Sequence, residues 1–464
     1  MCRILTRSGA FAKAVQLLSN GCWGTRWGVV QSGLGPAVWP DGSLTSIILP
    51  VLMTASCLHA RLRAHKNYRR LEQIACDSHA RGRAPEGIAE RDVILARLYS
   101  HAFRGEVIGA FHATRLALQS LSVDDPLAAL HLRRAAETLE SLANRSMDGV
   151  GHDARALVST FHHYCTHLVR VLDALHDARE RLRRPDLDRI VELFVSRMEV
   201  IAGGNGIHLT RDLEPPPQAS FIVPNLGITI VPLVYGDHHS WNLAWLPAEK
   251  ADVPYHQHHA GVEIHLGYGP MHGYTVLGDT KAELVEGYAM PIPPKTRHGY
   301  TNIGSLPHHV PFIFGSLRCG GWGVFLDVEP QPRELDLLQT APVLGPKLNG
   351  TILLERELDK AAARFASVRY PLIPASATDR DGVGGLELSV ARVTERGLDW
   401  KLDRYCAVSV VRGTGILTIA GESRELTSHD HFGIPAGVTA QIRQTGREPL
   451  VLLDCMIKLA RDRA

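Results

Sequence analysis

The sequence Tyr-His-Gln-His-His-Ala-Gly-Val-Glu occupies residues 255–263 and concentrates imidazole and carboxylate side chains in one short segment. Successive side chains of a β-strand point to opposite faces, so His256 and His258 are expected on the same face. Glu263 follows after a gap that requires a turn or a bulge, and that gap can return its carboxylate to the same interior. Imidazole and carboxylate groups together bind divalent transition metals, so this segment predicts part of a metal site.

A second segment, residues 287–302, reads Gly-Tyr-Ala-Met-Pro-Ile-Pro-Pro-Lys-Thr-Arg-His-Gly-Tyr-Thr-Asn and carries His298 after a proline-rich turn. A strand re-entering the same domain here would bring His298 to the other three side chains. Three imidazoles and one carboxylate suit one divalent ion of Zn, Fe, Mn, Ni or Co, and a six-coordinate ion keeps positions open for substrate or water. Because the imidazoles must be neutral and the carboxylate ionised, the predicted binding fails at low pH.

Three further side chains flank these ligand candidates. His265 shares strand parity with Glu263 and is expected to point inward, as an acid–base residue or as a hydrogen-bonded interior histidine. Lys295 and Arg297 lie beside His298 near the predicted opening of the domain. They are candidates for holding a phosphate or carboxylate of the substrate, with solvated loop charges as the alternative.

Short β-rich runs separated by Gly, Pro, Asn and Asp surround both segments and return in a second block. Many short strands with turn signals are typical of barrels and sandwiches. We therefore predict a metal-binding barrel over residues 218–345 and a second barrel over residues 350–464. Between them, residues 353–366 are predicted to form a connecting helix.

Residues 86–205 carry the periodicity of amphipathic helices and few prolines, and they predict a helical bundle of four segments. Helix starts are expected near Pro126, Asp153 and Pro185. Residues 1–85 are predicted to be a poorly defined extension. Its acid-poor first part is interpreted as an organelle transit peptide, a poorly ordered extension or the result of an upstream start codon. The predicted fold class is α+β, with an N-terminal all-α bundle followed by two jelly-roll-like barrels.

Composition excludes some partners. The formal net charge of the 464 residues is +2, which gives no overall basic field of the kind that holds nucleic acid. No apolar stretch reaches the roughly 18 residues of a membrane helix. The eight cysteines are scattered singly, which favours a reducing, cytoplasmic compartment. We expect a small-molecule substrate, no nucleic acid and no membrane, with the helical region as a candidate dimerisation element.

The two segments resemble the motifs of the cupin family. Cupins have a first motif of His-x-His, three or four residues and Glu, and a second motif of Gly-x5-Pro-x-Gly-x2-His-x3-Asn. His256-Gln-His258, four residues and Glu263 match the first motif. The second motif is matched at Gly287, Pro293, His298 and Asn302. The resemblance implies a β-barrel in which His256, His258, Glu263 and His298 bind the metal.

Three positions depart from these motifs, and one of them is the glycine after Glu263, which is out of register at Gly267 and Gly269. Lys295 stands in place of the internal glycine of the second motif, and Lys250 stands in place of the leading glycine of the first. The later β-rich block resembles a second cupin barrel, with Ala440 where a ligand histidine would be. The resemblance therefore implies a metal-free second barrel, somewhat as in phosphomannose-isomerase-type cupins.

Three functions follow from these predictions. The favoured one is a sugar or sugar-phosphate isomerase or epimerase, in which the metal polarises a carbonyl and His265 moves a proton between neighbouring carbons. The first alternative is a non-haem Fe(II) dioxygenase, since iron cupins share the same ligand set. The second is a non-catalytic small-molecule sensor, in which the helices transmit ligand binding by the barrel.

Overall fold

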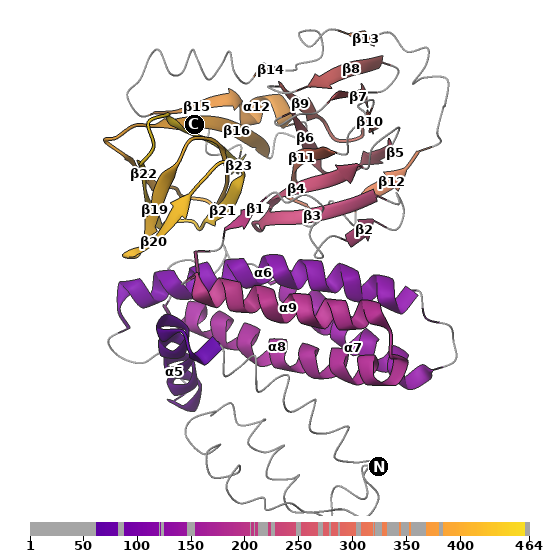
Figure 1. Cartoon of the computed structure of the whole chain (residues 1–464), viewed down its shortest axis with the longest axis vertical. Helices are drawn as coiled ribbons and strands as arrows, with labels where there is room; N and C mark the ends of the chain where they lie inside the picture. The colour runs from indigo at the N-terminus through magenta and orange to yellow at the C-terminus, as the bar shows by residue number, and fades with distance from the viewer. Residues whose placement is uncertain are drawn as a thin grey trace, which may run out of the picture.

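A layer of helices lies along one side of a pair of β-barrels in the computed structural model of the chain (Figure 1). The structure describes residues 62–81, 88–119, 121, 125–145, 154–204, 206–207, 209–211, 221–223, 228–246, 252–267, 272–277, 280–285, 288–302, 308–318, 320, 327–331, 343–344, 352–353, 368–379 and 384–459. Most of the predicted N-terminal extension and, apart from residue 353, the predicted connecting helix lie outside these ranges.

Three of the described helices begin at the starts predicted near Pro126, Asp153 and Pro185. The helices are α5 (Lys66–Arg81), α6 (Glu90–Gln119), α7 (Pro126–Ala143), α8 (Ala154–Leu182) and α9 (Pro185–Gly203). At the start of α7, the Asp125 carboxylate accepts the backbone N–H groups of Leu127 and Ala128, with Pro126 as the next residue.

Helix α5 extends the helical region to the N-terminal side of the predicted boundary at residue 86. Its Tyr68 is buried, and the Tyr68 ring lies 5.6 Å from the ring of Phe161 on α8 in an edge-on arrangement. Buried Leu71 belongs to the same core. These apolar side chains need the other helices to cover them, and so part of the predicted extension packs as a helix.

The first barrel consists of two facing sheets. Its strands are β2 (Phe221–Val223), β3 (Ile228–Tyr235), β4 (His239–Leu246), β5 (Asp252–His258), β6 (Val262–Gly267), β7 (His272–Leu277), β8 (Thr280–Val285), β9 (Tyr288–Ile292), β10 (His298–Asn302), β11 (His308–Gly315), β12 (Val328–Pro330), β13 (Val343–Leu344) and β14 (Ile352–Leu353). One sheet has the order β14-β9-β6-β11-β4-β3-β2 and the other β12-β5-β10-β7-β8-β13.

The second barrel also has two sheets. Its elements are β15 (Val368–Ile373), the short helix α12 (Ala375–Thr378), β16 (Gly384–Val393), β17 (Leu398–Lys401), β18 (Cys406–Arg412), β19 (Gly415–Ile419), β20 (Glu422–Leu426), β21 (Asp430–Ile434), β22 (Thr439–Gln444) and β23 (Leu450–Leu459). The sheet orders are β1-β21-β18-β23-β16-β15 and β17-β22-β19-β20. Strand β1 (Thr210–Arg211) precedes the first barrel in sequence but pairs with β21 of the second.

Buried apolar side chains connect the two barrels to each other and the helices to the second barrel. Trp241 and Leu243 of the first barrel share a buried cluster with Leu386, Leu453 and Ile457 of the second. Fully burying a leucine or isoleucine contributes about 1.5–3 kcal/mol, so this sheet-on-sheet contact is substantial. Another buried cluster runs from the helices into the interior of the second barrel. The α+β class and the barrel architecture are therefore as predicted.

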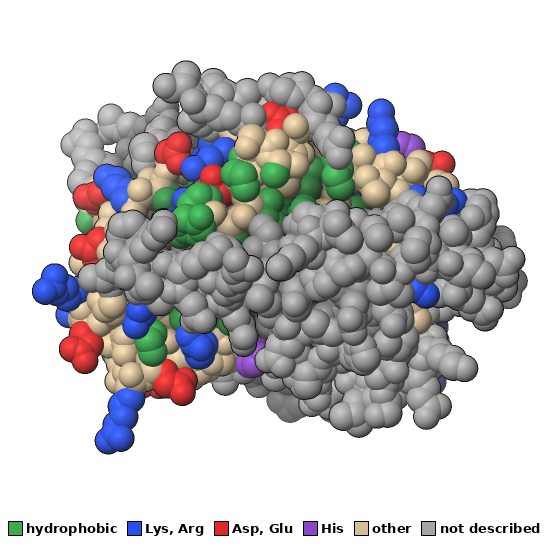
Figure 2. All heavy atoms as spheres, turned by 90° about the horizontal axis from the view of Figure 1, so that it is seen from above, with side chains coloured by type: hydrophobic (Ala, Val, Ile, Leu, Met, Phe, Trp, Pro, Cys, Tyr) green, Lys and Arg blue, Asp and Glu red, His purple; other side chains and the backbone are tan. Residues whose placement is uncertain are grey.

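Where this face of the barrels is described, basic and acidic side chains are interspersed around apolar ones that gather near the middle of the view (Figure 2). That distribution agrees with the near-zero net charge of the sequence. Within the part of the chain that the structure describes, no helix is long and apolar enough to cross a membrane.

Candidate metal centre

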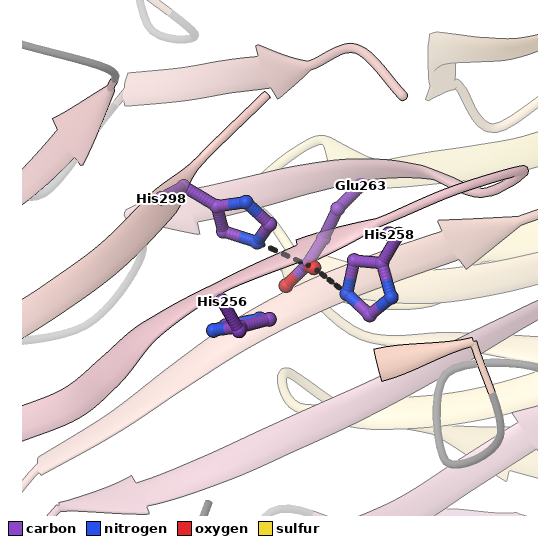
Figure 3. A group of neighbouring side chains, drawn as sticks. All are labelled: His256, His258, Glu263 and His298. Carbon is purple, nitrogen blue, oxygen red and sulfur yellow. Dashed lines mark hydrogen bonds and ion pairs between the residues drawn. The ribbon is translucent and has the colours of Figure 1, made fainter. Parts of the chain in front are cut away.

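The predicted ligands come from both sheets of the first barrel. His256 and His258 lie on β5, and His298 lies on the neighbouring strand β10, where it pairs directly with His256. Glu263 lies on β6 in the facing sheet. The turn after β5 carries the chain from one sheet to the other, so the carboxylate points across the barrel toward the imidazoles (Figure 3).

These four side chains converge as predicted. One ligand atom of each lies within 4.8 Å of the others, and all four residues are buried. The Glu263 Oε2 atom lies 3.0 Å from Nε2 of His258 and 3.1 Å from Nε2 of His298. Two ligand atoms bound at right angles, each about 2.1 Å from a common ion, are about 3 Å apart, so these separations fit a shared metal.

Backbone carbonyl groups hold the histidine rings. The Nδ1 atoms of His256, His258 and His298 lie 2.8, 2.9 and 2.8 Å from the carbonyl oxygens of Pro254, Asp327 and Thr296. A carbonyl only accepts hydrogen bonds, so each Nδ1 carries the proton and each Nε2 presents its lone pair inward. Lone pairs of His258 and His298 then face the Glu263 carboxylate, and a cation bound between them would relieve this repulsion.

His265 points into the same interior, as strand parity predicts. Its Nε2–H group donates to Glu263 Oε1 at 2.9 Å, because a carboxylate can only accept. The other ring nitrogen, Nδ1, is then the acceptor for the Thr275 hydroxyl at 3.3 Å. His265 therefore orients the Glu263 carboxylate and leaves Oε2 directed at His258 and His298.

Electrostatics keep these groups in the protonation states that a metal needs. Burial lowers the pKa of His298, and burial together with the neighbouring imidazoles lowers the pKa of His256 well below its usual value. Burial by itself would raise the pKa of Glu263. Contacts with the surrounding histidines outweigh burial and hold that pKa well below its usual value. The imidazoles of His256 and His298 are thus neutral and the Glu263 carboxylate is ionised.

The pH at which metal is lost should reflect these shifts. Protons compete with the metal for the imidazoles, and the lowered pKa values of His256 and His298 move that competition to lower pH. We expect bound metal to be retained at about pH 6, where an ordinary histidine is mostly protonated, and to be lost in more acidic buffer. Elemental analysis after dialysis over a pH series measures this. Loss of half of the bound metal at a pH above the pKa of a free histidine would contradict this expectation.

Lys295 occupies a turn position with a backbone conformation that favours glycine. Its φ is +60°, and the N–H group of Thr296 donates to the carbonyl of Pro293 across the turn. The backbone N–H of Lys295 donates to the carbonyl oxygen of His258 at 2.6 Å, while its side chain is exposed. Its backbone, rather than its ammonium group, therefore supports the site. The positive φ also gives a physical reason for the glycine of the cupin motif.

Replacing Lys295 by glycine separates the backbone role from the predicted substrate-binding role. A non-glycine residue in the left-handed region costs about 1–2 kcal/mol, so Lys295→Gly should leave the free energy of unfolding unchanged or raise it by up to about 1 kcal/mol. Urea unfolding measures this, with Lys295→Ala as the control that keeps the strain but removes the ammonium group. Clear destabilisation by glycine would show that the lysine side chain contributes to the turn.

Arg297 packs its guanidinium group over the ring of Tyr255, 5.6 Å from the ring centroid. Tyr255 is buried on β5 between Pro254 and His256. This contact braces the turn against the ligand-bearing strand. The role of Lys295 and Arg297 in binding a substrate stays a prediction.

Two contributors to the site were missed by sequence reasoning. The hydroxyl group of Thr275 on β7 hydrogen-bonds to His265. The backbone carbonyl of Asp327, 69 residues away in the sequence, accepts a hydrogen bond from His258. A lone threonine and a lone aspartate far from the motifs carry no spacing signal. In the second barrel, Ala440 occupies the position at which cupins have a ligand histidine. This residue is buried on β22, and its side chain has no ligand atom. The metal-free state of this barrel stays a prediction.

The fold and the site together define a two-sheet β-barrel protein with three histidines and one glutamate clustered in its interior. The two motifs, the pair of barrels and the converging ligand set resemble those of the cupin superfamily. No protein-family model matches the chain, and no curated protein matches it.

Some solved structures are similar to this chain. A salicylate 1,2-dioxygenase from Pseudaminobacter salicylatoxidans has 15% identity and a TM-score of 0.41, covering 55% of this chain and 87% of that chain. The same enzyme with gentisate has 15% identity and a TM-score of 0.36, covering 48% and 73%. A cupin 2 conserved barrel domain protein from Leptotrichia buccalis has 11% identity and a TM-score of 0.32, covering 50% and 89%.

Proposed function

We propose that the chain is a metal-dependent cupin enzyme of the dioxygenase type, with a single ferrous ion held by His256, His258, Glu263 and His298. The choice of reaction rests on the hydrogen bonds made by the two ring nitrogens of His265. An isomerase of the predicted kind requires a free base near the substrate. Both ring nitrogens of His265 are instead engaged, one with Glu263 and the other with Thr275. His265 supports a ligand, which leaves the metal as the centre of the chemistry.

The donor set suits this proposal. Neutral imidazoles with one carboxylate bind iron well, and a four-ligand set leaves open positions on a six-coordinate ion for a small organic substrate and for oxygen. When bound, the metal would supply redox and Lewis-acid chemistry. The protein would supply a buried, water-poor interior and imidazole rings held in one tautomer by backbone carbonyls.

Oxygen consumption tests the reaction. Protein loaded anaerobically with Fe²⁺ would be mixed with aerobic buffer and a panel of hydroxylated aromatic acids that includes salicylate and gentisate, the molecules named for the similar structures. We expect substrate-dependent oxygen uptake with Fe²⁺ and none with Zn²⁺. The matched control is the Glu263→Gln variant. Absence of uptake across the panel, with iron demonstrably bound, would count against the dioxygenase.

A second candidate, the sugar or sugar-phosphate isomerase or epimerase, keeps one favourable feature. The turn that contains Lys295 and Arg297 adjoins His298, and basic side chains there suit a phosphorylated substrate. Interconversion of aldose and ketose phosphates by Zn²⁺- or Mn²⁺-loaded protein, without oxygen uptake, would favour this candidate over the dioxygenase.

A further inference from the structure

The short edge strand β12 pairs with β5, the strand of the first barrel that carries His256 and His258. The pairing is antiparallel, so that Val328 lies opposite His258 and Pro330 opposite His256. Asp327 directly precedes β12 and lies at the end of β5, beside the turn at residues 259–261. That turn joins His258 on one sheet to Glu263 on the other, and it sets the separation of these two ligands.

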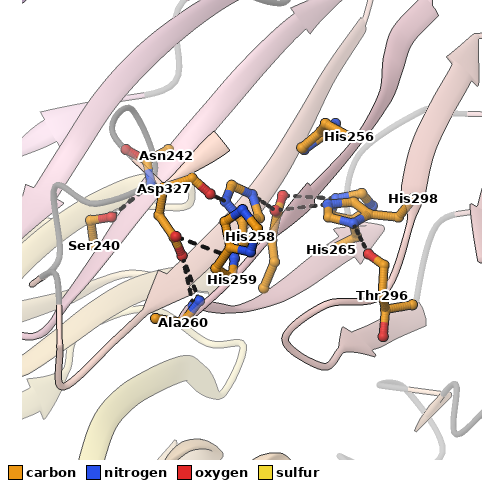
Figure 4. A network of polar contacts seen from close by, with 12 residues as sticks. Ser240, Asn242, His256, His258, His259, Ala260, His265, Thr296, His298 and Asp327 are labelled. Carbon is orange, nitrogen blue, oxygen red and sulfur yellow. Dashed lines mark hydrogen bonds and ion pairs between the residues drawn. The ribbon is translucent and has the colours of Figure 1, made fainter. Parts of the chain in front are cut away.

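The Asp327 carboxylate binds the backbone of this turn. It accepts the N–H groups of His259 at 3.2 Å, Ala260 at 2.8 Å and Gly261 at 2.9 Å (Figure 4). Hydrogen bonds to an ionised acceptor are about twice as strong as those between neutral groups. Three successive amides that converge on one carboxylate hold the turn in a single conformation.

The backbone of the same residue orients a ligand. The carbonyl oxygen of Asp327 accepts the Nδ1–H group of His258 at 2.9 Å. Its side chain therefore holds the turn while its main chain holds the imidazole ring. The carboxylate also fixes the position of this carbonyl, because both belong to one residue tied at two points.

Packing leaves the turn little room to adopt another shape. A Cβ atom on Gly261 would come within 2.1 Å of two ring atoms of Phe314, which is fully buried. The Phe314 ring centroid lies 5.0 Å from that of His258, and Phe314 pairs with Glu263 across β11 and β6. A displaced turn would therefore disturb both ligands.

We propose that Asp327 is a positioning residue of the metal centre, which holds His258 and Glu263 at the separation that the ion requires. The inference rests on the proposed metal site and extends it to a residue outside both sequence motifs. Residues that orient metal ligands typically affect affinity by about 10- to 100-fold. Asp327→Ala should weaken metal binding within this range, because the turn and the His258 ring gain freedom that binding must then remove.

A neighbouring acid, Glu329 on β12, supplies a matched control. Glu329 accepts from the Gln257 amide at 2.6 Å and contacts Nε2 of His259 at 2.9 Å, and its side chain is 44% exposed. It contacts only the side chains of Gln257 and His259 in these bonds, whereas Asp327 bonds the turn backbone. Glu329→Ala removes an equal charge within two residues and should leave metal affinity unchanged within about twofold, as expected for an exposed pair.

The test uses Co²⁺ as the probe, because its visible absorption reports the ligand arrangement as well as the affinity. The full chain and its Asp327→Ala, Asp327→Asn and Glu329→Ala variants would be titrated with Co²⁺. Asparagine retains one acceptor oxygen for the turn, so its affinity should lie between those of wild type and Asp327→Ala. The absorption bands should shift in the Asp327 variants alone. Circular dichroism would check that each variant is folded, and the asparagine variant carries the test if the alanine variant does not fold.

The results distinguish a failure of the Asp327 positioning role from a failure of the metal site. Wild-type affinity and spectrum in the Asp327 variants, or an equal loss in Glu329→Ala, would overturn the positioning role while leaving the metal site intact. Failure of the wild-type chain to bind Co²⁺, or binding that survives Glu263→Gln unchanged, would overturn the metal site and with it the role of Asp327.

Discussion

Replacing Glu263 by glutamine is expected to lower the metal affinity of the chain by about 100-fold or more, beyond the range seen when only a supporting residue is lost. The carboxylate is the central group of the site, because Oε2 lies within 3.1 Å of Nε2 of both His258 and His298. Glutamine has nearly the same shape but no charge. It would leave the lone pairs of buried imidazoles facing a neutral amide instead of an anionic ligand.

Isothermal titration with Zn²⁺ and elemental analysis of the purified variant measure this effect. Glu329→Gln is the control, because it makes the same chemical change at a half-exposed acid of the same barrel. We expect near-wild-type metal content in the control and background content in Glu263→Gln. Equal metal content in the two variants would mean that the ion is bound elsewhere.

Asp237→Ala should cost about 3–5 kcal/mol of unfolding free energy, because it leaves a buried guanidinium group without its charged partner. Asp237 lies in the turn between β3 and β4 and forms an ion pair with Arg104 of α6, with both side chains about 95% buried. Arg104 also donates to the carbonyl of Ala143 at 3.1 Å. The pair therefore ties the helical layer to the first barrel through groups that water cannot reach.

Chemical denaturation followed by circular dichroism measures this cost. The control is Asp188→Ala, which removes the acid of an exposed pair with Arg179 on the helices and should cost less than about 1 kcal/mol. A small loss for Asp237→Ala, comparable with that of Asp188→Ala, would show that Arg104 finds water or another acceptor when its partner is removed. The ion pair between Arg104 and Asp237 would then contribute little to the connection between the helices and the first barrel.

Local signals made parts of the structure predictable. The start of α7 follows from Asp125 and Pro126, since a capping carboxylate and a proline act on the amides directly beside them. The inward direction of His256, His258 and His265 follows from the two-residue period of a strand. Their convergence with His298 required two motifs in the right order, and the resemblance to a known family supplied that order.

Contacts between distant segments could not be predicted. Strand β1 pairs Thr210 with His431 of the second barrel, although the whole first barrel lies between them in sequence. Asp327 reaches His258 only because β12 adds to the edge of β5. The engagement of His265 with Thr275 depends on the register of a facing sheet. Tertiary packing determines each of these contacts, and no periodic pattern in the sequence indicates them.

The stoichiometry of bound metal tests the central claim most directly. The full chain would be purified from medium supplemented with Fe²⁺, Mn²⁺ and Zn²⁺, and its metal content measured by elemental mass spectrometry beside that of the Glu263→Gln variant. The converging atoms of His256, His258, Glu263 and His298 predict about one transition-metal ion per wild-type chain and almost none in the variant. A wild-type chain without stoichiometric metal, or a variant that retains it, would contradict the account.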